Sequence, residues 1–317
     1  MPSSFPTVPV SGVWCPAVTM FDPATDRLDP EAQARYYRYL STSGLAGLVI
    51  LGTNAETFLL TREERRELLT IARAACGPDF PIMAGVGGHS TRQVLEFVAD
   101  AAKAGANYVL VLPPAYFGKA TTPQVIKAFF ADVAAASPLP VVVYNFPGVC
   151  NGVDLDSATI ASLAKQHDNI IGVKLTCGSV AKITRLAAEL PAERFAVFGG
   201  QGDFLLGGLA VGSAGCIAAF ANVFPKTIVE IYRLYGNDNP KEALALHRRA
   251  ALAEQATKAG GIAAIKYAAS VFTAPVAGLK GKEEWFNPRR PYLPLSEDQK
   301  RAVREALEGL VEVERGL

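Results

Sequence analysis

The sequence has little histidine and no recognisable metal-binding motif. The three histidines, His89, His167 and His247, lie far apart and form neither an HxH nor an HExxH pattern. The five cysteines are scattered along the chain, and no pair has the spacing of metal ligands. We therefore expect no metal site, and we interpret the cysteines as reduced thiols of an intracellular protein.

The sequence also lacks an excess of either charge and any long apolar run. The 31 Lys and Arg residues nearly balance the 30 Asp and Glu residues, so the net charge of +1 gives no reason to expect nucleic acid or an anionic membrane as a partner. No run is long enough to cross a bilayer. Residues 1–13 contain several prolines and lack the basic segment of a secretory signal, which predicts a cytoplasmic protein.

What the sequence does contain is a regular alternation of short apolar runs and helical patterns. Amphipathic stretches occur at 62–75, 92–104 and 157–166, and Thr61 with Glu64 forms a capping box before the first of them. Eight strand–helix units favour a closed (β/α)8 TIM barrel; a doubly wound open sheet is the alternative, although no GxGxxG turn follows the first run. The eight apolar runs are 12–20, 47–51, 81–86, 108–112, 141–145, 170–175, 195–198 and 215–219.

The pattern changes after the eighth run. Residues beyond this point are typical of helices only, at 224–235, 240–256, 262–274 and 297–313. No linker is long or polar enough to separate them as an independent domain. We expect a barrel over residues 1–225 that carries the active site, and a helical appendage over 226–317 that belongs to the same structural unit.

Lys174 is the most informative single residue, because it lies in an otherwise apolar run. An ammonium group is costly to desolvate, so such a lysine either extends to water or serves a working site. Tyr144 ends the preceding run, one βα unit earlier, which would place the two residues on adjacent parallel strands. A desolvated lysine beside a phenol suits Schiff-base chemistry on a carbonyl compound. Lys266 is the main rival, but its helical setting predicts a side chain that reaches solvent.

Other candidate residues lie where the runs end, because the working residues of such a barrel lie at the carboxyl ends of its strands. These positions hold Thr53 and Asn54 after the second run, Tyr116 after the fourth, Gly199 after the seventh and Ala218 in the eighth. The N–H groups of a turn such as the one at Thr53 and Asn54 can hold a carboxylate without a formal charge. Further residues that could line a pocket are Thr176, Cys177, Gln201 and Phe220, and Glu56 is expected to brace its turn.

Three of these segments together resemble the pyruvate-dependent class I aldolase superfamily that contains dihydrodipicolinate synthase and N-acetylneuraminate lyase. They are the G-[ST]-x-x-E loop at 52–56, the Y-N-x-P strand end at 144–147 and the G-x-K strand end at 172–174. The similarity covers essentially the whole chain, including its helical C-terminal part. It implies an enzyme that needs no organic cofactor or metal and that assembles as a homotetramer of two tight dimers.

The resemblance also implies a role for each matching residue. Lys174 would form an imine with the C2 carbonyl of pyruvate or a longer 2-oxo acid, and Tyr144 would move protons. Thr53 and Asn54 would hold the carboxylate, and Tyr116 would reach a neighbouring subunit's site. The chemistry agrees, because a protonated imine accepts electrons and lets the adjacent carbon lose an aldehyde. With no histidine near these motifs, Tyr144 is the best-placed proton carrier.

The chain departs from the synthases of this family at two points. Asn54 stands where they typically carry a second threonine, and no arginine follows residues 144–147 to bind the carboxylate of aspartate semialdehyde. As in the fungal branch, we therefore expect a reversible lyase that cleaves a 2-keto-3-deoxy sugar acid or 4-hydroxy-2-oxoglutarate to pyruvate and an aldehyde. The alternatives are 4-hydroxy-tetrahydrodipicolinate synthase, a dehydratase that shares the imine step, and a catalytically silent barrel that binds sugar acids.

Overall fold

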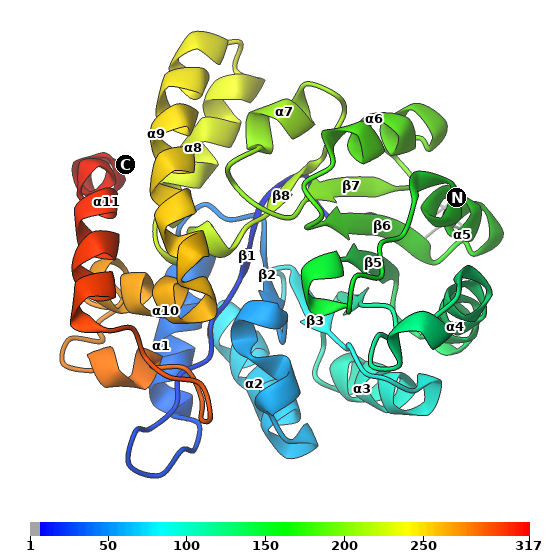
Figure 1. Cartoon of the computed structure of the whole chain (residues 1–317), viewed down its shortest axis with the longest axis horizontal. Coiled ribbons are helices and arrows are strands. Elements are labelled where there is room, and N and C mark those ends of the chain that lie inside the picture. The colour runs from blue at the N-terminus through cyan, green and yellow to red at the C-terminus, as the bar shows by residue number, and fades with distance from the viewer. Residues whose placement is uncertain (1–6) are drawn as a thin grey trace.

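Eight parallel strands form a closed barrel at the centre of the molecule (Figure 1). The structure is a computed structural model that describes residues 7–317. Pairing of β1 with β8 closes the ring, so the predicted (β/α)8 barrel is confirmed and the open doubly wound sheet is excluded. The strands are β1 Gly12–Pro16, β2 Gly47–Ile50, β3 Ile82–Gly85, β4 Tyr108–Val111, β5 Val141–Asn145, β6 Ile170–Leu175, β7 Ala196–Gly199 and β8 Gly215–Ile217.

A helix follows each strand and packs outside the barrel. The predicted capping box is present, because Thr61 and Glu64 bond each other's backbone N–H groups at the start of α2. The helices are α1 Pro30–Ser41, α2 Arg62–Cys76, α3 Thr91–Lys103, α4 Pro123–Ala136, α5 Ser157–Gln166, α6 Val180–Glu189, α7 Leu205–Leu209 and α8 Pro225–Gly236. Short 3-10 turns interrupt the loops: η1 Thr53–Ala55, η2 Thr57–Leu59, η3 Gly118–Ala120, η4 Pro147–Val149, η5 Ala219–Asn222 and η6 Glu283–Phe286.

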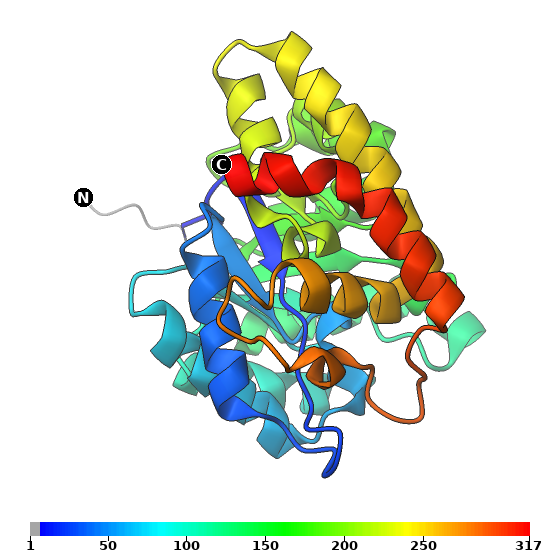
Figure 2. The same cartoon turned by 90° about the vertical axis from the view of Figure 1, so that its left-hand side faces the viewer.

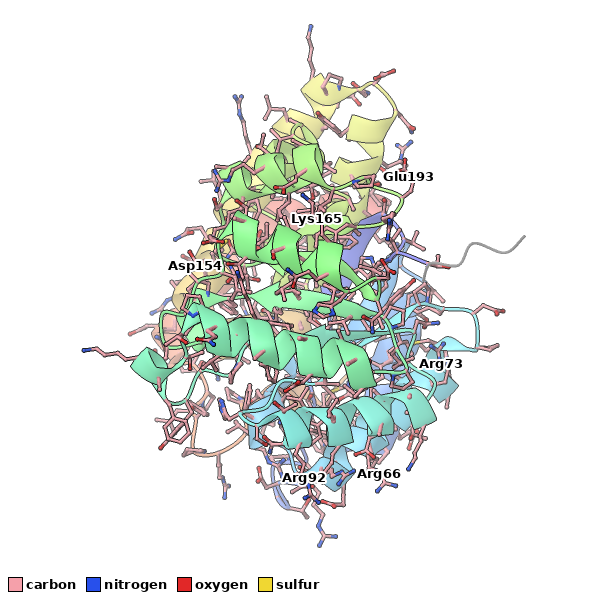
Figure 3. All side chains as sticks on the ribbon, turned by 90° about the vertical axis from the view of Figure 1, so that its right-hand side faces the viewer. Arg66, Arg73, Arg92, Asp154, Lys165 and Glu193 are labelled. Carbon is pink, nitrogen blue, oxygen red and sulfur yellow. The ribbon has the colours of Figure 1, made fainter. Side chains whose placement is uncertain are left out.

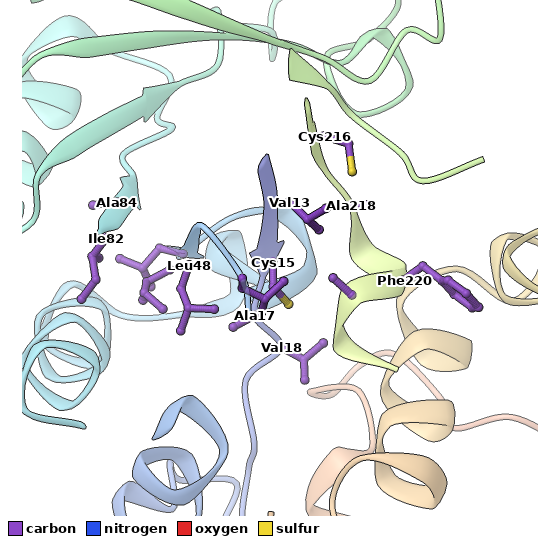
Figure 4. Packing of buried hydrophobic residues seen from close by; sticks show 14 of the residues in the cluster. Val13, Cys15, Ala17, Val18, Leu48, Ile82, Ala84, Cys216, Ala218 and Phe220 are labelled. Atoms are coloured by element: carbon purple, nitrogen blue, oxygen red, sulfur yellow. The ribbon is translucent and has the colours of Figure 1, made fainter. Parts of the chain in front are cut away.

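Two layers of apolar side chains stabilise the barrel, because successive strand residues point to opposite faces. Trp14 and Phe198 belong to the inner layer, where their rings meet edge to face. Cys15, Cys216 and Ala218 belong to the outer layer between strands and helices (Figure 4). The strands are therefore apolar on both faces, which is why their sequences read as nearly continuous apolar runs.

The outer faces of the helices are polar. Figure 3 shows this surface along α3 to α6, where Arg92 and Lys165 lie exposed. Their amphipathic pattern predicted α2, α3 and α5 to within one residue at each end. Within residues 7–317, no helix is both long and apolar enough to span a membrane.

The seam between β1 and β8 requires glycine. Gly12 and Gly215 have φ values of +139° and +141°, a region that other residues rarely adopt. A Cβ atom on Gly215 would lie 2.0 Å from the carbonyl oxygen of Gly12. These two glycines allow the first and last strands to approach closely enough to close the barrel.

The first strand is shorter than the predicted run of 12–20, because side-chain amides take over its hydrogen bonds after Pro16. The N–H of Val18 donates to Asn222 Oδ1 at 3.1 Å, and the N–H of Met20 donates to Gln33 Oε1 at 2.9 Å. Both amide side chains are fully buried. The backbone thus stays satisfied while it leaves the sheet, which sequence periodicity alone does not reveal.

Three more helices cover one flank of the barrel (Figure 2). They are α9 Pro240–Ala259, α10 Gly261–Phe272 and α11 Glu297–Gly316, and α9 packs against α8, α10 and α11. The carboxylate of Glu314 accepts hydrogen bonds from the N–H groups of Lys226 and Thr227, which fixes the end of α11 to the start of α8. The C-terminal helices are therefore anchored to the barrel by polar contacts as well as by packing.

Candidate active site

Lys174 and Tyr144 face each other inside the barrel, as predicted. They are register partners on β6 and β5, and both side chains point to the interior. Lys174 is 1% exposed and Tyr144 is 3% exposed. The Lys174 Nζ lies 4.2 Å from the centre of the Tyr144 ring. An amine and a phenol thus share a site that is almost closed to bulk water.

Thr53 continues this line of polar groups. It begins η1, in the loop that follows β2, and its Oγ1 lies 3.5 Å from the Tyr144 hydroxyl, with either oxygen able to donate. The neighbouring Asn54 faces the same cavity. Residues from strands two, five and six therefore meet at the carboxyl end of the barrel, where the active sites of this fold lie.

These residues line a cavity of about 420 Å³, a size that suits a small organic acid. The barrel strands and their loops form one side of it, and α9 and α10 form the other. Its lining residues are Thr53, Asn54, Tyr144, Phe146, Val149, Lys174, Thr176, Gly200, Gln201, Ala219, Glu254, Thr257, Lys258, Gly261, Ile262 and Ile265.

Two of the four predicted pocket residues, Thr176 and Gln201, line the cavity. Phe220 is instead buried in the core, where its ring packs edge to face on Phe224. Cys177 is half-buried at the end of β6 and packs against the outer apolar layer, so it is not part of the described cavity wall. The backbone turns after β6, so Thr176 and Cys177 point in different directions although they are neighbours in the sequence. The sequence does not show the direction of this turn.

The two predicted substrate-binding positions near β7 and β8 lie one residue before the cavity wall. Gly199 is the last residue of β7, and Ala218 is buried after β8. The wall itself is formed by Gly200 and Ala219. Sequence patterns place the ends of strands only to within a few residues, which accounts for this offset.

Tyr116 lies apart from the cavity of its own chain. It is 73% exposed, and its ring contacts those of Phe117 and His89 at centroid distances of 5.3 and 5.9 Å. The His89 ring also stacks on Phe58 at 5.4 Å. Tyr116 is thus one of an exposed aromatic cluster beside the barrel mouth, and within one chain the structure does not bring it to Lys174.

The expectation that Lys266 reaches solvent is wrong. This lysine is fully buried in α10, and its Nζ donates to Glu56 Oε1 at 2.6 Å and to the carbonyl of Asn287 at 2.8 Å. Burial lowers the pKa of Lys266 to about 8, although Glu56 opposes this shift. The other carboxylate oxygen of Glu56 accepts from the N–H of Arg289 at 2.7 Å. Glu56 therefore braces its turn, as predicted, and Lys266 is its counter-charge.

Sequence reasoning missed the polar residues that α9 contributes to the cavity. Glu254 is 3% exposed, and its Oε1 accepts a hydrogen bond from the N–H of Gly202 at 3.1 Å. Lys258 donates to Gln201 Oε1 at 2.9 Å and to Asp203. A Glu and a Lys four residues apart on a helix are typical of a solvated face, so the pattern carries no signal of a site. Only the packing of α9 over the barrel mouth shows their role.

The carboxyl of Glu254 has an unusual proton affinity. Burial raises its pKa to about 7, with a further contribution from the nearby Asp203 carboxylate, while the Gly202 N–H and Lys258 act in the opposite direction. Within residues 7–317, three His, Cys, Asp or Glu side chains are nowhere grouped to hold a metal ion. The titratable groups that line the cavity are Tyr144 and Lys174 on the strands and Glu254 and Lys258 on α9.

The raised pKa of Glu254 makes the stability of the protein depend on pH. Because the folded state holds this proton more tightly, stability falls as pH rises from the ordinary carboxyl value of 4.5 to about 7, by about 3 kcal/mol. Glu254→Gln lacks this loss. Urea unfolding at pH 4.5, 6, 8 and 9 measures this difference. The stability of the variant relative to the native protein should increase between pH 4.5 and 8 and stay constant between pH 8 and 9. A difference that does not change with pH would contradict the assignment.

Comparison with known proteins identifies the family. The model of the dihydrodipicolinate synthetase family matches residues 9–310. The chain belongs to this family. Its members include aldolases, and the prediction of a carbon–carbon lyase that cleaves a 2-oxo-4-hydroxy acid is confirmed at the level of this class.

Two fungal family members and one crystal structure are similar over nearly the whole chain. A Coccidioides immitis protein, provisionally named a mitochondrial 4-hydroxy-2-oxoglutarate aldolase, is 65% identical over 98% of this chain and 99% of its own length. The L-threo-3-deoxy-hexylosonate aldolase of Aspergillus niger is 34% identical over 96% of each chain. The crystal structure of a family protein from Coccidioides immitis superposes with a TM-score of 0.93 at 62% identity, over 98% of this chain and 99% of that one.

The predicted cytoplasmic location is wrong. The Coccidioides immitis relative, which is 65% identical to this chain, is named a mitochondrial protein. Composition and cysteine usage separate secreted proteins from intracellular ones. They do not distinguish one compartment inside the cell from another, so they gave no ground for choosing the cytoplasm.

Proposed function

We propose that this family member is a class I aldolase in which Lys174 forms a Schiff base with the C2 carbonyl of its substrate. The observation that carries the proposal is the buried Lys174 Nζ, 4.2 Å from the Tyr144 ring in an otherwise apolar barrel. A Schiff base requires an amine that reaches the carbonyl carbon of a bound substrate, and Lys174 lines the cavity. The substrate would be a 2-oxo-4-hydroxy acid, and the products would be pyruvate and an aldehyde.

The reaction follows from these two side chains. The amine adds to C2, and loss of water leaves a protonated imine. A base then removes the proton from the C4 hydroxyl, the C3–C4 bond breaks towards the imine, and the aldehyde leaves. The remaining enamine takes up a proton at C3, and water releases pyruvate and the free lysine. Tyr144, whose hydroxyl is shared with Thr53, would carry these protons.

The remaining substrate contacts belong to the same proposal. Thr53 and Asn54 would hold the carboxylate of the pyruvate half through their turn. The strand ends at Gly199 and Ala218 would position the wall residues that follow them, Gly200 and Ala219. Tyr116 would complete the site of a neighbouring subunit in a tetramer made of two tight dimers. Its exposed aromatic cluster beside the barrel mouth supports this arrangement.

We further propose that the barrel of residues 1–225 and the helices of residues 226–317 act as one unit. The support is that α9 and α10 supply part of the cavity wall, including Glu254 and Ile265. Removing these helices would therefore remove part of the cavity wall and expose the site to solvent.

Borohydride trapping tests the Schiff base directly. The purified chain is incubated with pyruvate and sodium borohydride, and its peptides are mapped by mass spectrometry. A reduced pyruvyl adduct on Lys174 is the expected result. An adduct on Lys266 would mean that the wrong lysine was chosen, and an unmodified protein would refute the class I mechanism and favour a barrel that only binds sugar acids.

Tyr144→Phe should separate imine formation from proton transfer. Loss of the hydroxyl is expected to lower kcat by roughly 10²- to 10⁴-fold, the usual contribution of a general acid–base group. Pyruvate should still be trapped on Lys174, though more slowly. Tyr108→Phe is the matched control, because Tyr108 is another inward-facing tyrosine whose hydroxyl donates to the Val8 carbonyl instead. Equal losses of kcat in both variants would show that Tyr144 does not act as the acid–base group.

A further inference from the structure

The part of the cavity wall formed by α9 carries polar side chains that have no role in the proposed imine mechanism. We propose that Glu254 and Lys258, with Thr176, form a subsite for a hydroxyl-bearing aldehyde tail. The favoured substrate is then a 2-keto-3-deoxy sugar acid rather than 4-hydroxy-2-oxoglutarate, whose tail is a carboxylate. This inference rests on the proposed aldolase function, because Lys174 must fix the C2 end of the substrate in the same cavity.

The first support is a pair of buried polar atoms without partners. Glu254 Oε2 and Thr176 Oγ1 have no hydrogen-bond partner among the described residues, and both side chains line the cavity. Buried polar atoms are nearly always bonded, and these two oxygens lie against Gly200 and Gly202. Because no protein group holds either oxygen, a small rotation of each side chain would turn it towards a ligand in the cavity. The carboxyl oxygen in its ionised form can only accept, so its partner must carry an O–H or N–H. A sugar hydroxyl donates and accepts; a carboxylate tail only accepts.

The second support is the charge of this wall. The Lys258 ammonium is already paired with Asp203 and bonded to Gln201. Glu254 lies beside the same Asp203, which helps to raise its pKa. A substrate carboxylate here would lie against the Glu254 carboxyl, with the Asp203 carboxylate behind the wall, and would meet an ammonium that is already engaged. Like charges in a buried site repel strongly. Neutral hydroxyls meet no such repulsion.

The other titratable groups near Glu254 do not change this balance. On α9, His247 Nε2 lies 2.8 Å from the Gly202 carbonyl, which occupies that nitrogen. On β8, burial raises the pKa of the Cys216 thiol, which keeps it neutral. The wall therefore offers one paired cation and a carboxyl that exchanges a proton near pH 7.

Aldol synthesis from pyruvate with two aldehydes tests the inference. Glyceraldehyde carries the hydroxyls of a sugar-acid tail, and glyoxylate carries a carboxylate. We expect the native protein to show a kcat/KM for glyceraldehyde at least about tenfold above that for glyoxylate, the effect of roughly one net hydrogen bond. Glu254→Leu should lose about that factor with glyceraldehyde, mainly through KM. With glyoxylate it should lose nothing and should gain activity, because the carboxyl that repels the carboxylate tail is gone.

Three further variants make the result specific. Glu254→Gln retains a donor and an acceptor and should keep most of the glyceraldehyde activity. Lys258→Met should weaken glyceraldehyde binding by several-fold, because it releases Gln201 and Asp203 from their positions. Glu242→Gln, at an exposed position of the same helix, should have no effect. All variants should still be trapped by pyruvate and borohydride on Lys174.

The possible failures can be told apart. A native protein that prefers glyoxylate, or a Glu254→Leu variant that loses both aldehydes equally, overturns the tail subsite and leaves the Schiff-base mechanism intact. A native protein that forms no pyruvyl adduct refutes the proposed function itself, and the subsite with it.

Discussion

Lys174→Ala is expected to lower the rate of aldol cleavage by roughly 10⁴-fold or more, and to abolish the borohydride adduct. Covalent catalysis by a positioned amine has no substitute in the cavity, because the other nearby lysine, Lys258, is engaged by Asp203 and Gln201. The variant should still bind pyruvate weakly, since the turn at Thr53 remains. Steady-state assays of pyruvate release, together with the trapping experiment, measure both effects.

The matched control for this experiment is Lys165→Ala. Lys165 is an exposed lysine on the outer face of α5, paired with Glu189 (Figure 3). Its removal also takes away one amine, yet it should leave the rate within about twofold of the native value, as is usual for surface positions. A Lys174→Ala variant that retained more than a small fraction of the native rate would end the Schiff-base proposal.

Lys266→Met should be the most destabilising single change outside the apolar core. It leaves the carboxylate of Glu56, 3% exposed at its side chain, buried without its counter-charge. Breaking a buried ion pair in this way costs about 3–5 kcal/mol in the free energy of unfolding. Urea denaturation at neutral pH measures the loss, and Lys241→Met, at an exposed position of α9, serves as the control.

The double variant Lys266→Met with Glu56→Gln shows whether the single variant is destabilised by the unpaired charge or by the changed side-chain packing. Because it removes both charges, it should recover much of the stability that the single variant loses. Since Glu56 also accepts from the Arg289 N–H and ends the Thr53 turn, the single variant should raise KM for pyruvate more than it lowers kcat. A single variant as stable as the native protein would show that the pair contributes nothing to the fold.

The barrel and its central pair of residues follow from the sequence for a physical reason. Consecutive strands of a parallel barrel are neighbours in space, so two residues at the ends of successive apolar runs must meet. Tyr144 and Lys174 satisfy this condition, and their strands pair in that register. Local patterns were thus sufficient wherever the contact joins elements adjacent along the chain.

The predictions failed where a contact joins distant segments. Lys266 and its partner Glu56 are 210 residues apart, so nothing near either residue in the sequence indicates the pair. Glu254 and Lys258 gave no signal, because the pattern of α9 does not show that it packs over the barrel mouth. The side of a helix that faces a neighbour is set by tertiary packing, which a single sequence does not display.

Because α9 forms part of the cavity wall, two different sets of elements supply the side chains of the site. The strands fix the groups proposed to bind and activate the oxo-acid half, and their interlocked registers tolerate few substitutions. The inward residues of α9 at 254, 257 and 258 belong to no strand, so they can change while the strand registers are kept. Substitutions confined to these three positions, in evolution or in a directed-evolution library, can therefore change the aldehyde specificity. The reaction proposed for Lys174 would stay the same.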